Sequence, residues 1–415
     1  MNKTKMLTKA ALAALATAAG VSAAHAQTAP APSHSTSWTG TVGEDRYGDA
    51  RFKVRGRFQY DVYSQDWDIG AEDQSRSFVR RAFLGVQGRF SEQWRYKVDF
   101  VLAPGDEAAG QVGVDDAFLE WVNDSWSIVI GEANITSPLE DRISSLDVPF
   151  NERSSIINAY EYGRRAGLGF ITGGANWSAS AAVQGDSLNN GDTLSGGANG
   201  DESTAISGRF TFAPWFETTP EGVNLVHLGL HARQRDRADD GVFQYRTRPL
   251  NGRGDRLISS TALGEEDFSY GAEAAVQFGP FGAQAEYIRL DGDGAGGVSF
   301  ESDGYYVDVY WSLTGESRNY RGNQGSFGAI VPRNPVTNEG GWGHWMLSAR
   351  YDFIDLSDAA FGANRGEQSA YAVGLDWIPI DHVRFKLNYA LSDMDRAAAA
   401  DDEAQIISLR TQFDF

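Results

Sequence analysis

The 415-residue chain contains no cysteine, which excludes disulfides, iron–sulfur clusters and a thiol nucleophile. After residue 26 it has only three lysines (Lys53, Lys97 and Lys386), so arginine carries nearly all of the positive charge. The formal net charge is −20, which argues against nucleic acid as a partner. No run of about 18 apolar residues occurs, which excludes a membrane protein built from helices. A hydrophobic content of 41% nevertheless excludes disorder.

Catalytic signatures are also missing. His227 and His231 are four residues apart, but on a strand this spacing puts them about 13 Å apart, too far to share one metal. There is no G-x-S-x-G nucleophile motif. The acidic stretch 291–294 has too few ligands for a calcium loop and is interpreted as a turn. We therefore predict no catalytic residues, no metal and no cofactor, which disfavours an outer-membrane hydrolase.

The N-terminus has the three parts of a bacterial secretory signal. Residues 1–5 are basic, residues 6–20 are rich in Ala and Leu, and Ala24-His-Ala26 is a small-residue cleavage site. Cleavage there leaves 389 residues with a formal charge of −23. Residues 27–49 are rich in Pro, Ser, Thr, Ala and Gly and are expected to form a flexible periplasmic leader.

Apolar and polar residues alternate through the rest of the chain with a period of two, which is typical of strands with one apolar face. The last strand ends the chain on an aromatic residue. Its two parities are Ile407, Leu409, Thr411, Phe413, Phe415 and Ser408, Arg410, Gln412, Asp414. Sixteen such segments are predicted: 51–62, 77–90, 93–103, 114–123, 125–132, 164–172, 175–184, 203–213, 223–235, 267–279, 281–291, 302–314, 343–354, 369–378, 382–393 and 404–415.

Many connectors alternate between short turns and long loops, as in bacterial outer-membrane barrels with an even strand number. The connector 315–341 is long but falls on the short-turn side, where we interpret it as a long periplasmic turn. A soluble β-sandwich is the competing architecture. The apolar face here is rich in Trp, Tyr and Phe, and the polar face carries Arg and Asp, which favours lipid outside and water inside. Residues 50–415 are therefore predicted to form an all-β, transmembrane antiparallel barrel of about 16 strands.

Arginines two residues apart on one strand project from the same face. Arg233, Arg235 and Arg237 share the inward parity of His227 and His231, which suggests an anion track along the wall. The alternative is that Asp236, Asp239 and Asp240 neutralise a solvated loop base. Further candidates for the track are Arg246, Arg248, Arg80 and Arg81. For the pairs Arg80-Arg81 and Arg164-Arg165, anchoring at the water interface or binding of lipopolysaccharide phosphates is an equal alternative.

The insertion from Ala133 to Gly163 contains too many apolar residues for a free extracellular loop. It is expected to fold into the lumen and narrow the pore, with a surface loop lying on a neighbouring subunit as the alternative. The polar residues predicted to set the constriction are Glu132, Asn134, Arg142, Arg153, Arg164 and Arg165.

Taken together, several motifs resemble the phosphate-selective porin (O/P) family of Gram-negative outer membranes. They are Arg80-Arg-Ala-Phe-Leu-Gly-Val86, Asp116-Ala-Phe-Leu-Glu120, Glu152-Arg-Ser154, Tyr162-Gly-Arg-Arg165, Tyr245-Arg-Thr-Arg-Pro249, Leu313-Thr-Gly-Glu-Ser-Arg318, Gly340-Gly-Trp-Gly-His-Trp345, Ala349-Arg-Tyr351, Asp355-Leu-Ser-Asp358, Asp381-His-Val-Arg-Phe385 and Arg410-Thr-Gln-Phe-Asp-Phe415. The resemblance covers most of the mature chain.

This resemblance implies a homotrimeric sixteen-stranded barrel with its third loop inside. It also implies an arginine ladder and passive transport of small anions, with phosphate or polyphosphate as substrates. One departure is that the inserted loop contains no lysine, whereas the family sets phosphate with lysines at the constriction. A general, weakly selective diffusion porin is the alternative function. Expected partners are small anions, outer-membrane lipid and lipopolysaccharide, the barrel assembly machinery through the Phe415 strand, and two further copies of the chain.

Overall fold

The computed structural model describes residues 50–69, 72–102, 112–188, 203–220, 222–237 and 242–415, together with the backbone of Trp38–Thr41. The predicted signal peptide and most of the predicted leader lie outside these residues. Within the described part of the chain, no helix is long and apolar enough to cross a bilayer.

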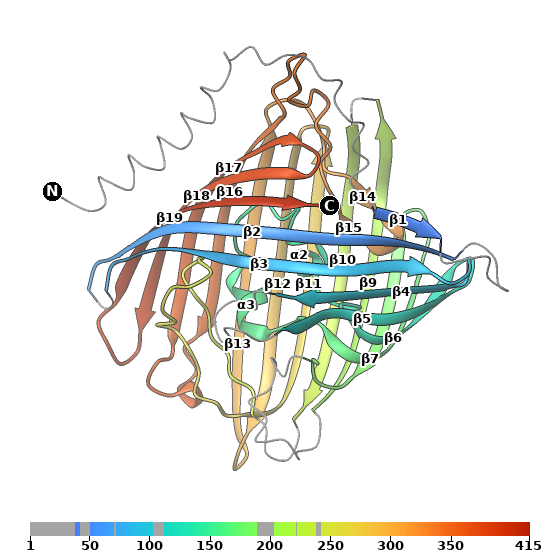
Figure 1. The fold of residues 1–415 in the computed structure, drawn as a ribbon. Helices are drawn as coiled ribbons and strands as arrows, with labels where there is room; N and C mark the ends of the chain where they lie inside the picture. The colour runs from blue at the N-terminus through green and yellow to red at the C-terminus, as the bar shows by residue number, and fades with distance from the viewer. Residues whose placement is uncertain are drawn as a thin grey trace.

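Sixteen antiparallel strands form a closed barrel (Figure 1), which confirms the predicted fold class and strand number. Each strand pairs with the next in the chain, and β19 closes the ring on β2 from Ala404↔Trp67 to Asp414↔Arg57. The barrel strands are β2 (Arg51–Trp67), β3 (Gln74–Arg89), β4 (Trp94–Val101), β5 (Gly113–Val122), β6 (Trp126–Ala133), β7 (Arg165–Gly173), β8 (Trp177–Gln184), β9 (Thr204–Thr219), β10 (Gly222–Asp236), β11 (Gly264–Phe278), β12 (Phe281–Gly294), β13 (Val298–Ser312), β16 (His344–Leu356), β17 (Gly366–Ile380), β18 (Val383–Arg396) and β19 (Asp402–Asp414).

The two faces of the wall are separated as the period of two predicts. On β19, Arg410 is fully buried inside the barrel, whereas Phe413 points outward and is 45% exposed. The C-terminus completes the closing seam, because the backbones of Phe415 and Gly56 exchange two hydrogen bonds of 3.1 Å. The Phe415 ring packs directly over Gly56, where a Cβ atom would lie 2.4 Å from the tip of the ring.

Aromatic side chains on the outer face form rows near both rims. Close to the short turns, Trp345 stacks on Trp377 at 5.5 Å, and Phe281 stacks on Trp311 at 5.6 Å. Tyr305 lies six residues before Trp311 on β13, a separation of about 20 Å at 3.4 Å per residue, and packs against Phe353 near the other rim. Two such rows flanking an apolar band are typical of a barrel that crosses the outer membrane.

A short additional strand, β1 (Trp38–Thr41), pairs with the beginning of β2 from Trp38↔Val54 to Thr41↔Arg51. These four residues differ from the flexible leader expected over 27–49. The physical reason is that β2 begins at Arg51, whereas its pairing with β19 begins at Arg57. The overhanging edge of β2 is left with free backbone groups, and β1 satisfies them.

The insertion predicted to enter the lumen does so. It carries two short helices, α2 (Leu139–Arg142) and α3 (Ser155–Tyr160), which lie inside the barrel in Figure 1. Its apolar side chains are buried: Leu139, Ile143 and Ile156 have no exposed surface. The alternative of a surface loop on a neighbouring subunit is therefore wrong.

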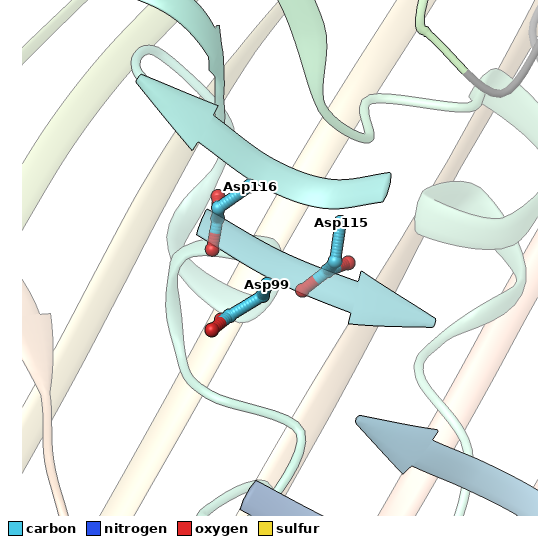
Figure 2. Close-up of side chains that lie close together, drawn as sticks. All are labelled: Asp99, Asp115 and Asp116. Carbon is cyan, nitrogen blue, oxygen red and sulfur yellow. The ribbon is translucent and has the colours of Figure 1, made fainter. Parts of the chain in front are cut away.

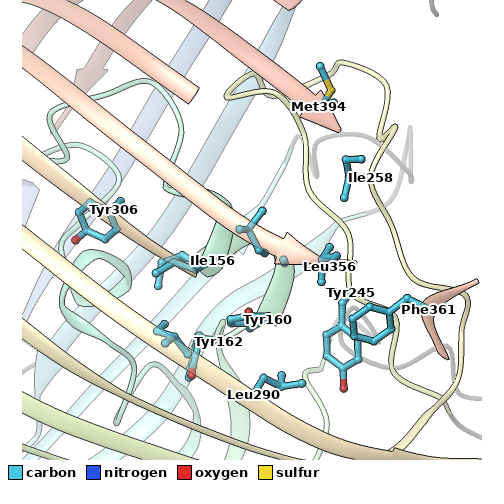
Figure 3. Close-up of a cluster of buried hydrophobic side chains, with 14 of the residues drawn as sticks. Ile156, Tyr160, Tyr162, Tyr245, Ile258, Leu290, Tyr306, Leu356, Phe361 and Met394 are labelled. Carbon is cyan, nitrogen blue, oxygen red and sulfur yellow. The ribbon is translucent and has the colours of Figure 1, made fainter. Parts of the chain in front are cut away.

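On one side, the barrel interior is a dry core and not the fully water-filled lumen that we expected. Ile156 and Tyr160 from α3 pack with Tyr245 and Phe361 from other loops (Figure 3). Inward-facing wall residues complete this cluster: Ile288, Leu290, Tyr306, Ile354, Leu356 and Ile406. Phe361 belongs to a 3-10 helix, η2 (Ala359–Phe361). The sequence pattern could not show this core, because it forms only where three loops fold inward onto the same wall.

The long connector 313–343 lies between β13 and β16 at the short-turn end of the barrel, as predicted. It contains β14 (Tyr320–Arg321), a 3-10 helix η1 (Gly322–Gln324) and β15 (Ser326–Phe327). This segment turns back into the lumen, where Arg209 of β9 donates hydrogen bonds to the carbonyls of Gln324 and Gly325. Segments thus enter the barrel from both ends, this connector from the short-turn side and the loops of the buried core from the other.

Candidate functional site

Basic side chains on β16 and β18 bind backbone carbonyls and a carboxylate of the inserted loop. Lys386 on β18 donates a hydrogen bond to the Val148 carbonyl, and Arg384 donates one to the Leu146 carbonyl. Arg350 on β16 binds the Glu140 carboxylate in the loop as well as Asp308 on β13, at 2.7 Å. All three cations are buried, and none of them lines the cavity described below.

Glu152 is the central anionic anchor of the same loop. Its carboxylate accepts two hydrogen bonds from Arg80 on β3, at 2.8 and 2.9 Å, and one from Arg410 on β19, at 3.0 Å. Burial alone would raise the pKa of Glu152, but the charges of Arg80, Arg410 and Arg81 hold that pKa well below its usual range. Glu152 is therefore ionised at neutral pH and connects the loop to two separate strands.

Two β-bulges change which side chains enter the lumen. The pairing of β2 with β3 skips Arg80, and the pairing of β4 with β5 skips Asp115. A bulge lets consecutive residues project toward the same face. Arg80 and Arg81 thus both point inward, and Asp115 and Asp116 do so on β5, facing Asp99 of β4 in Figure 2.

The space between the inserted loop and the wall formed by β2 to β7 is a cavity of about 660 Å³. Eight basic side chains line it: Arg55, Arg57, Arg81, Lys97, Arg142, Arg153, Arg164 and Arg321. Five acidic side chains also line it: Asp115, Asp116, Glu120, Asp141 and Asp147. The formal surplus is three positive charges, although the whole chain carries −20. The lining of this cavity thus has the opposite sign to the protein.

Four of these guanidiniums have no carboxylate within ion-pair distance among the described residues. Arg57 donates to the Ser145 hydroxyl at 2.8 Å, and Arg81 donates to the Gln59 amide oxygen at 3.0 Å. Arg142 donates to the Asn134 carbonyl, and Arg321 donates to the Gln324 side chain at 3.2 Å. Burial, followed by the charge of Arg209, lowers the pKa of Arg142 to about 10, so this side chain also stays charged at neutral pH.

The acidic residues of the cavity are mostly paired. Arg164 contacts Asp115 at 3.2 Å and Asp116 at 2.8 Å, and Lys97 lies 3.2 Å from Asp99 and bonds to Asp116. Burial would lower the pKa of Arg164, but the two aspartates raise it far above its usual value. The carboxylates of Asp99, Asp115 and Asp116 lie within 4.8 Å of one another, but the adjacent cations already compensate their charge. The three carboxylates thus belong to an ion-pair network with Arg164 and Lys97.

The three arginines of the predicted anion track are bound by other groups of the protein. Arg233 and Arg235 are buried on the inward face of β10. Arg233 donates to the carbonyls of Tyr160 and Glu161. Arg235 binds Asp267 on the adjacent strand at 2.5 Å, and Arg237 binds Glu265 at 2.6 Å. Of the neutralising partners considered from the sequence, Asp239 and Asp240 lie outside the described residues.

The other candidates divide into residues that line the cavity and residues that do not. Arg81, Asn134, Arg142, Arg153 and Arg164 line it. The others bind groups of the protein. Glu132, at the end of β6, accepts hydrogen bonds from the Ser187 hydroxyl and the Leu188 amide, and Arg165 donates one to the Gly185 carbonyl. Arg246 and Arg248 lie in the loop before β11, where Arg248 donates to the Gly254 carbonyl, and Arg80 binds Glu152.

Sequence reasoning did not select Arg55, Arg57, Lys97 or Arg321. A signal for the first two was present, because basic residues recur every second position from Arg51 to Arg57 on the inward parity of β2. The same rule that selected residues 233–237 applies to them. No pattern indicated Arg321, since it reaches the cavity only because the connector folds back inside.

Comparison with known proteins identifies the family and the fold. The sequence pattern of the family described as phosphate-selective porin O and P matches residues 52–415. This chain belongs to that family. It is 26% identical to Porin O of Pseudomonas aeruginosa over 404 residues, which cover 88% of each chain. It is 31% identical to an uncharacterised protein of Caulobacter vibrioides, over 96% of this chain and 80% of that one.

Solved structures show the same fold at low sequence identity. The anion-selective porin from Comamonas acidovorans is 10% identical, with a TM-score of 0.53, over 88% of this chain and all of that one. OmpT of Vibrio cholerae is 9% identical, with a TM-score of 0.54, over 88% of this chain and 98% of that one. The protein is an outer-membrane porin, and the sequence-based family assignment is confirmed.

Proposed function

We propose that this porin conducts small anions through the cavity between the inserted loop and strands β2 to β7. The observation that carries the proposal is the set of four lining guanidiniums without a carboxylate partner among the described residues: Arg57, Arg81, Arg142 and Arg321. Fixed charges along a narrow pore lower the entry barrier for ions of opposite sign, and transport then needs no chemistry.

The size of the effect follows from Coulomb's law. A unit charge about 4 Å from the ion contributes about 1 kcal/mol in bulk water and about 4 kcal/mol at an effective dielectric constant of 20. Even the smaller value corresponds to about a fivefold change in the local concentration of the anion, with an opposite change for the cation. Arg57 and Arg81 are the most informative pair, because they come from the rigid wall and not from the loop.

Phosphate and polyphosphate are the substrates that family membership suggests, and they remain part of this proposal. A general diffusion porin is the second candidate. Five lining acids favour it, because Asp115 and Asp116 already neutralise Arg164 and Lys97. The two functions differ in one measurable quantity, the reversal potential in a salt gradient.

Purified protein in a planar bilayer, under a tenfold KCl gradient, tests the proposal. We expect an anion-selective reversal potential in the wild type and at least a fivefold loss of selectivity in the double variant Arg57→Gln/Arg81→Gln. The triple variant Arg233→Ala/Arg235→Ala/Arg237→Ala tests the arginine ladder in the same assay. Arg289→Gln is a matched control, because Arg289 lies outside the cavity and pairs with Asp291 at 3.0 Å.

A reversal potential near zero in the wild type would favour the general diffusion porin. Selectivity lost in the triple variant and kept in the Arg57/Arg81 variant would move the anion path to β10. Addition of phosphate to one chamber then measures whether phosphate competes with chloride.

The proposal includes a homotrimer and a cleaved signal peptide over residues 1–26. Strands β4, β6 and β8 are each eight residues long, whereas a strand crossing the bilayer needs about 9–11. Their outer face still exposes apolar side chains, including Ile130 at 56%. A second copy of the chain would cover this short wall, which lipid alone fits poorly.

A further inference from the structure

The cavity has an apolar side that a channel for small hydrated ions does not need. In a water-filled barrel, the inward positions of the strands are expected to carry polar residues. Here four inward positions on β3, β5, β6 and β7 are apolar, namely Phe83, Phe118, Val129 and Ile171, and Ile135 of the inserted loop lies with them. Their chain neighbours on the opposite parity, such as Leu84 and Leu119, point outward and are 44% and 43% exposed. In this part of the barrel, the wall therefore carries apolar side chains on its inner face as well as on its outer face.

Packing of the loop accounts for part of this apolar side but not all of it. Ile135 fits against Gly169, where a Cβ atom would lie 2.4 Å from its Cδ1, and packs with Val129 in a small core. Phe118 and Ile171 lie at the edge of that core and are only partly buried. The β6 partner of Phe118 is Gly131, which has no side chain to cover the ring.

Cations stand directly beside the two aromatic rings. Arg57 and Phe83 are cross-strand partners, and the guanidinium lies 4.9 Å from the ring centroid. Lys97 and Phe118 are cross-strand partners on β4 and β5. Arg81 is two residues from Phe83 on the same inward face of β3. Each ring is therefore next to a positive charge that faces the same cavity.

The volume suits a solute larger than a simple inorganic ion. At about 30 Å³ per water molecule, 660 Å³ holds on the order of 20 waters. Pockets for organic ligands span about 300–1,000 Å³ and combine apolar walls with a few fixed polar groups. This cavity has both properties.

We infer that the constriction is a binding subsite for organic monoanions that join a carboxylate to a six-carbon apolar body, with Arg57 and Arg81 binding the carboxylate and Phe83 and Phe118 contacting the body. This rests on the proposed function and narrows its substrate class. Arginine binds a carboxylate through a planar pair of N–H donors, and burial of the body removes apolar surface from water. Acetate offers only the charge, and benzyl alcohol offers only the body.

The experiment measures block of the single-channel chloride current by benzoate, acetate and benzyl alcohol. For the wild type we expect benzoate to block at about one tenth of the acetate concentration, with little block by benzyl alcohol; a tenfold ratio corresponds to about 1.4 kcal/mol. Phe118→Ser should reduce the ratio to about twofold, and Phe118→Leu, which keeps an apolar side chain, should preserve it. Heat-dependent gel migration verifies that each barrel is folded, and Phe83→Ser is the second variant if Phe118→Ser does not fold.

Equal block by benzoate and acetate in the wild type overturns the inference, and so does a ratio that folded Phe118→Ser or Phe83→Ser leaves unchanged. Block by benzyl alcohol as strong as that by benzoate also overturns it, because the charge would then be irrelevant. The chloride-over-potassium selectivity is measured first, without any organic solute, and distinguishes failure of the proposed function from failure of the organic subsite. Its absence would reject the proposed function, whereas normal selectivity with a flat benzoate ratio rejects only the organic subsite.

Discussion

Replacing Glu152 by glutamine is expected to loosen the inserted loop without changing its shape. The carboxylate joins the loop to Arg80 and Arg410 through three hydrogen bonds of 2.8 to 3.0 Å. Each hydrogen bond to a charged group contributes about 1.5–3 kcal/mol, and removing one partner of a buried ion pair costs about 3–5 kcal/mol. Glutamine keeps one oxygen acceptor, so we take the lower end, about 3 kcal/mol. The undocked population of the loop should then rise on the order of 100-fold.

Two measurements follow this change. Single-channel recordings of Glu152→Gln should show a larger mean conductance and more current noise, because a loop that leaves the lumen widens the pore. Hydrogen exchange of the backbone amides over residues 150–158 should accelerate by a similar factor of about 100. Glu339→Gln is the matched control, since Glu339 is exposed and lies in the other connector. Unchanged conductance and exchange in Glu152→Gln would refute the anchoring role.

The pH dependence has a definite sign. The pKa of Glu152 is lower in the folded protein than in the unfolded chain, where it is about 4.3. Its stabilising contribution is therefore fully present above pH 4.3 and is lost only as the pH falls through the lower, folded value. The wild-type loop should stay docked at pH 5, whereas Glu152→Gln should show the loosened behaviour already at pH 7. Release of the wild-type loop between pH 6 and 5 would contradict this assignment.

Two further outcomes are expected. Gly169→Ala places a methyl group against Ile135, and this overpacking should lower the free energy of unfolding by about 1–3 kcal/mol. The temperature at which the folded form is lost in heat-dependent gel migration should fall. Gly208→Ala is the control, since its nearest contact is at 3.6 Å, and it should leave that temperature unchanged. Leu119→Arg puts a charge on the outer face of the short wall and should convert trimers to monomers in native gels. Leu347→Arg on the long wall should lower the yield of folded barrel instead, and trimers that survive Leu119→Arg would place the subunit contact elsewhere.

The strands were predictable because a barrel wall has a different solvent on each face. Lipid selects apolar side chains at one parity and the interior selects polar ones at the other, as at Phe413 and Arg410, so the pattern is local and can be read without knowing any contact. The closing aromatic strand and the apolar insertion were predictable for the same reason. All sixteen segments correspond to barrel strands.

The selection of pore residues depended on contacts that no local pattern contains. Arg235 and Arg57 both point inward, but Asp267 neutralises the first, whereas the second donates to the Ser145 hydroxyl and has no carboxylate within ion-pair distance in the described part of the chain. The sequence spacing is the same in both cases. The bulges at Arg80 and Asp115 are equally invisible, because a period of two predicts opposite faces for consecutive residues.

The sequence by itself therefore determined the cylinder, its orientation toward lipid and the presence of an internal loop, because these follow from the partition of each side chain between water and an apolar phase. Only the tertiary structure decided which inward cations face the cavity. The loop fills one side of the lumen and pairs with the basic residues there, so the charge that remains on the opposite wall depends on how distant segments meet after the ring has closed.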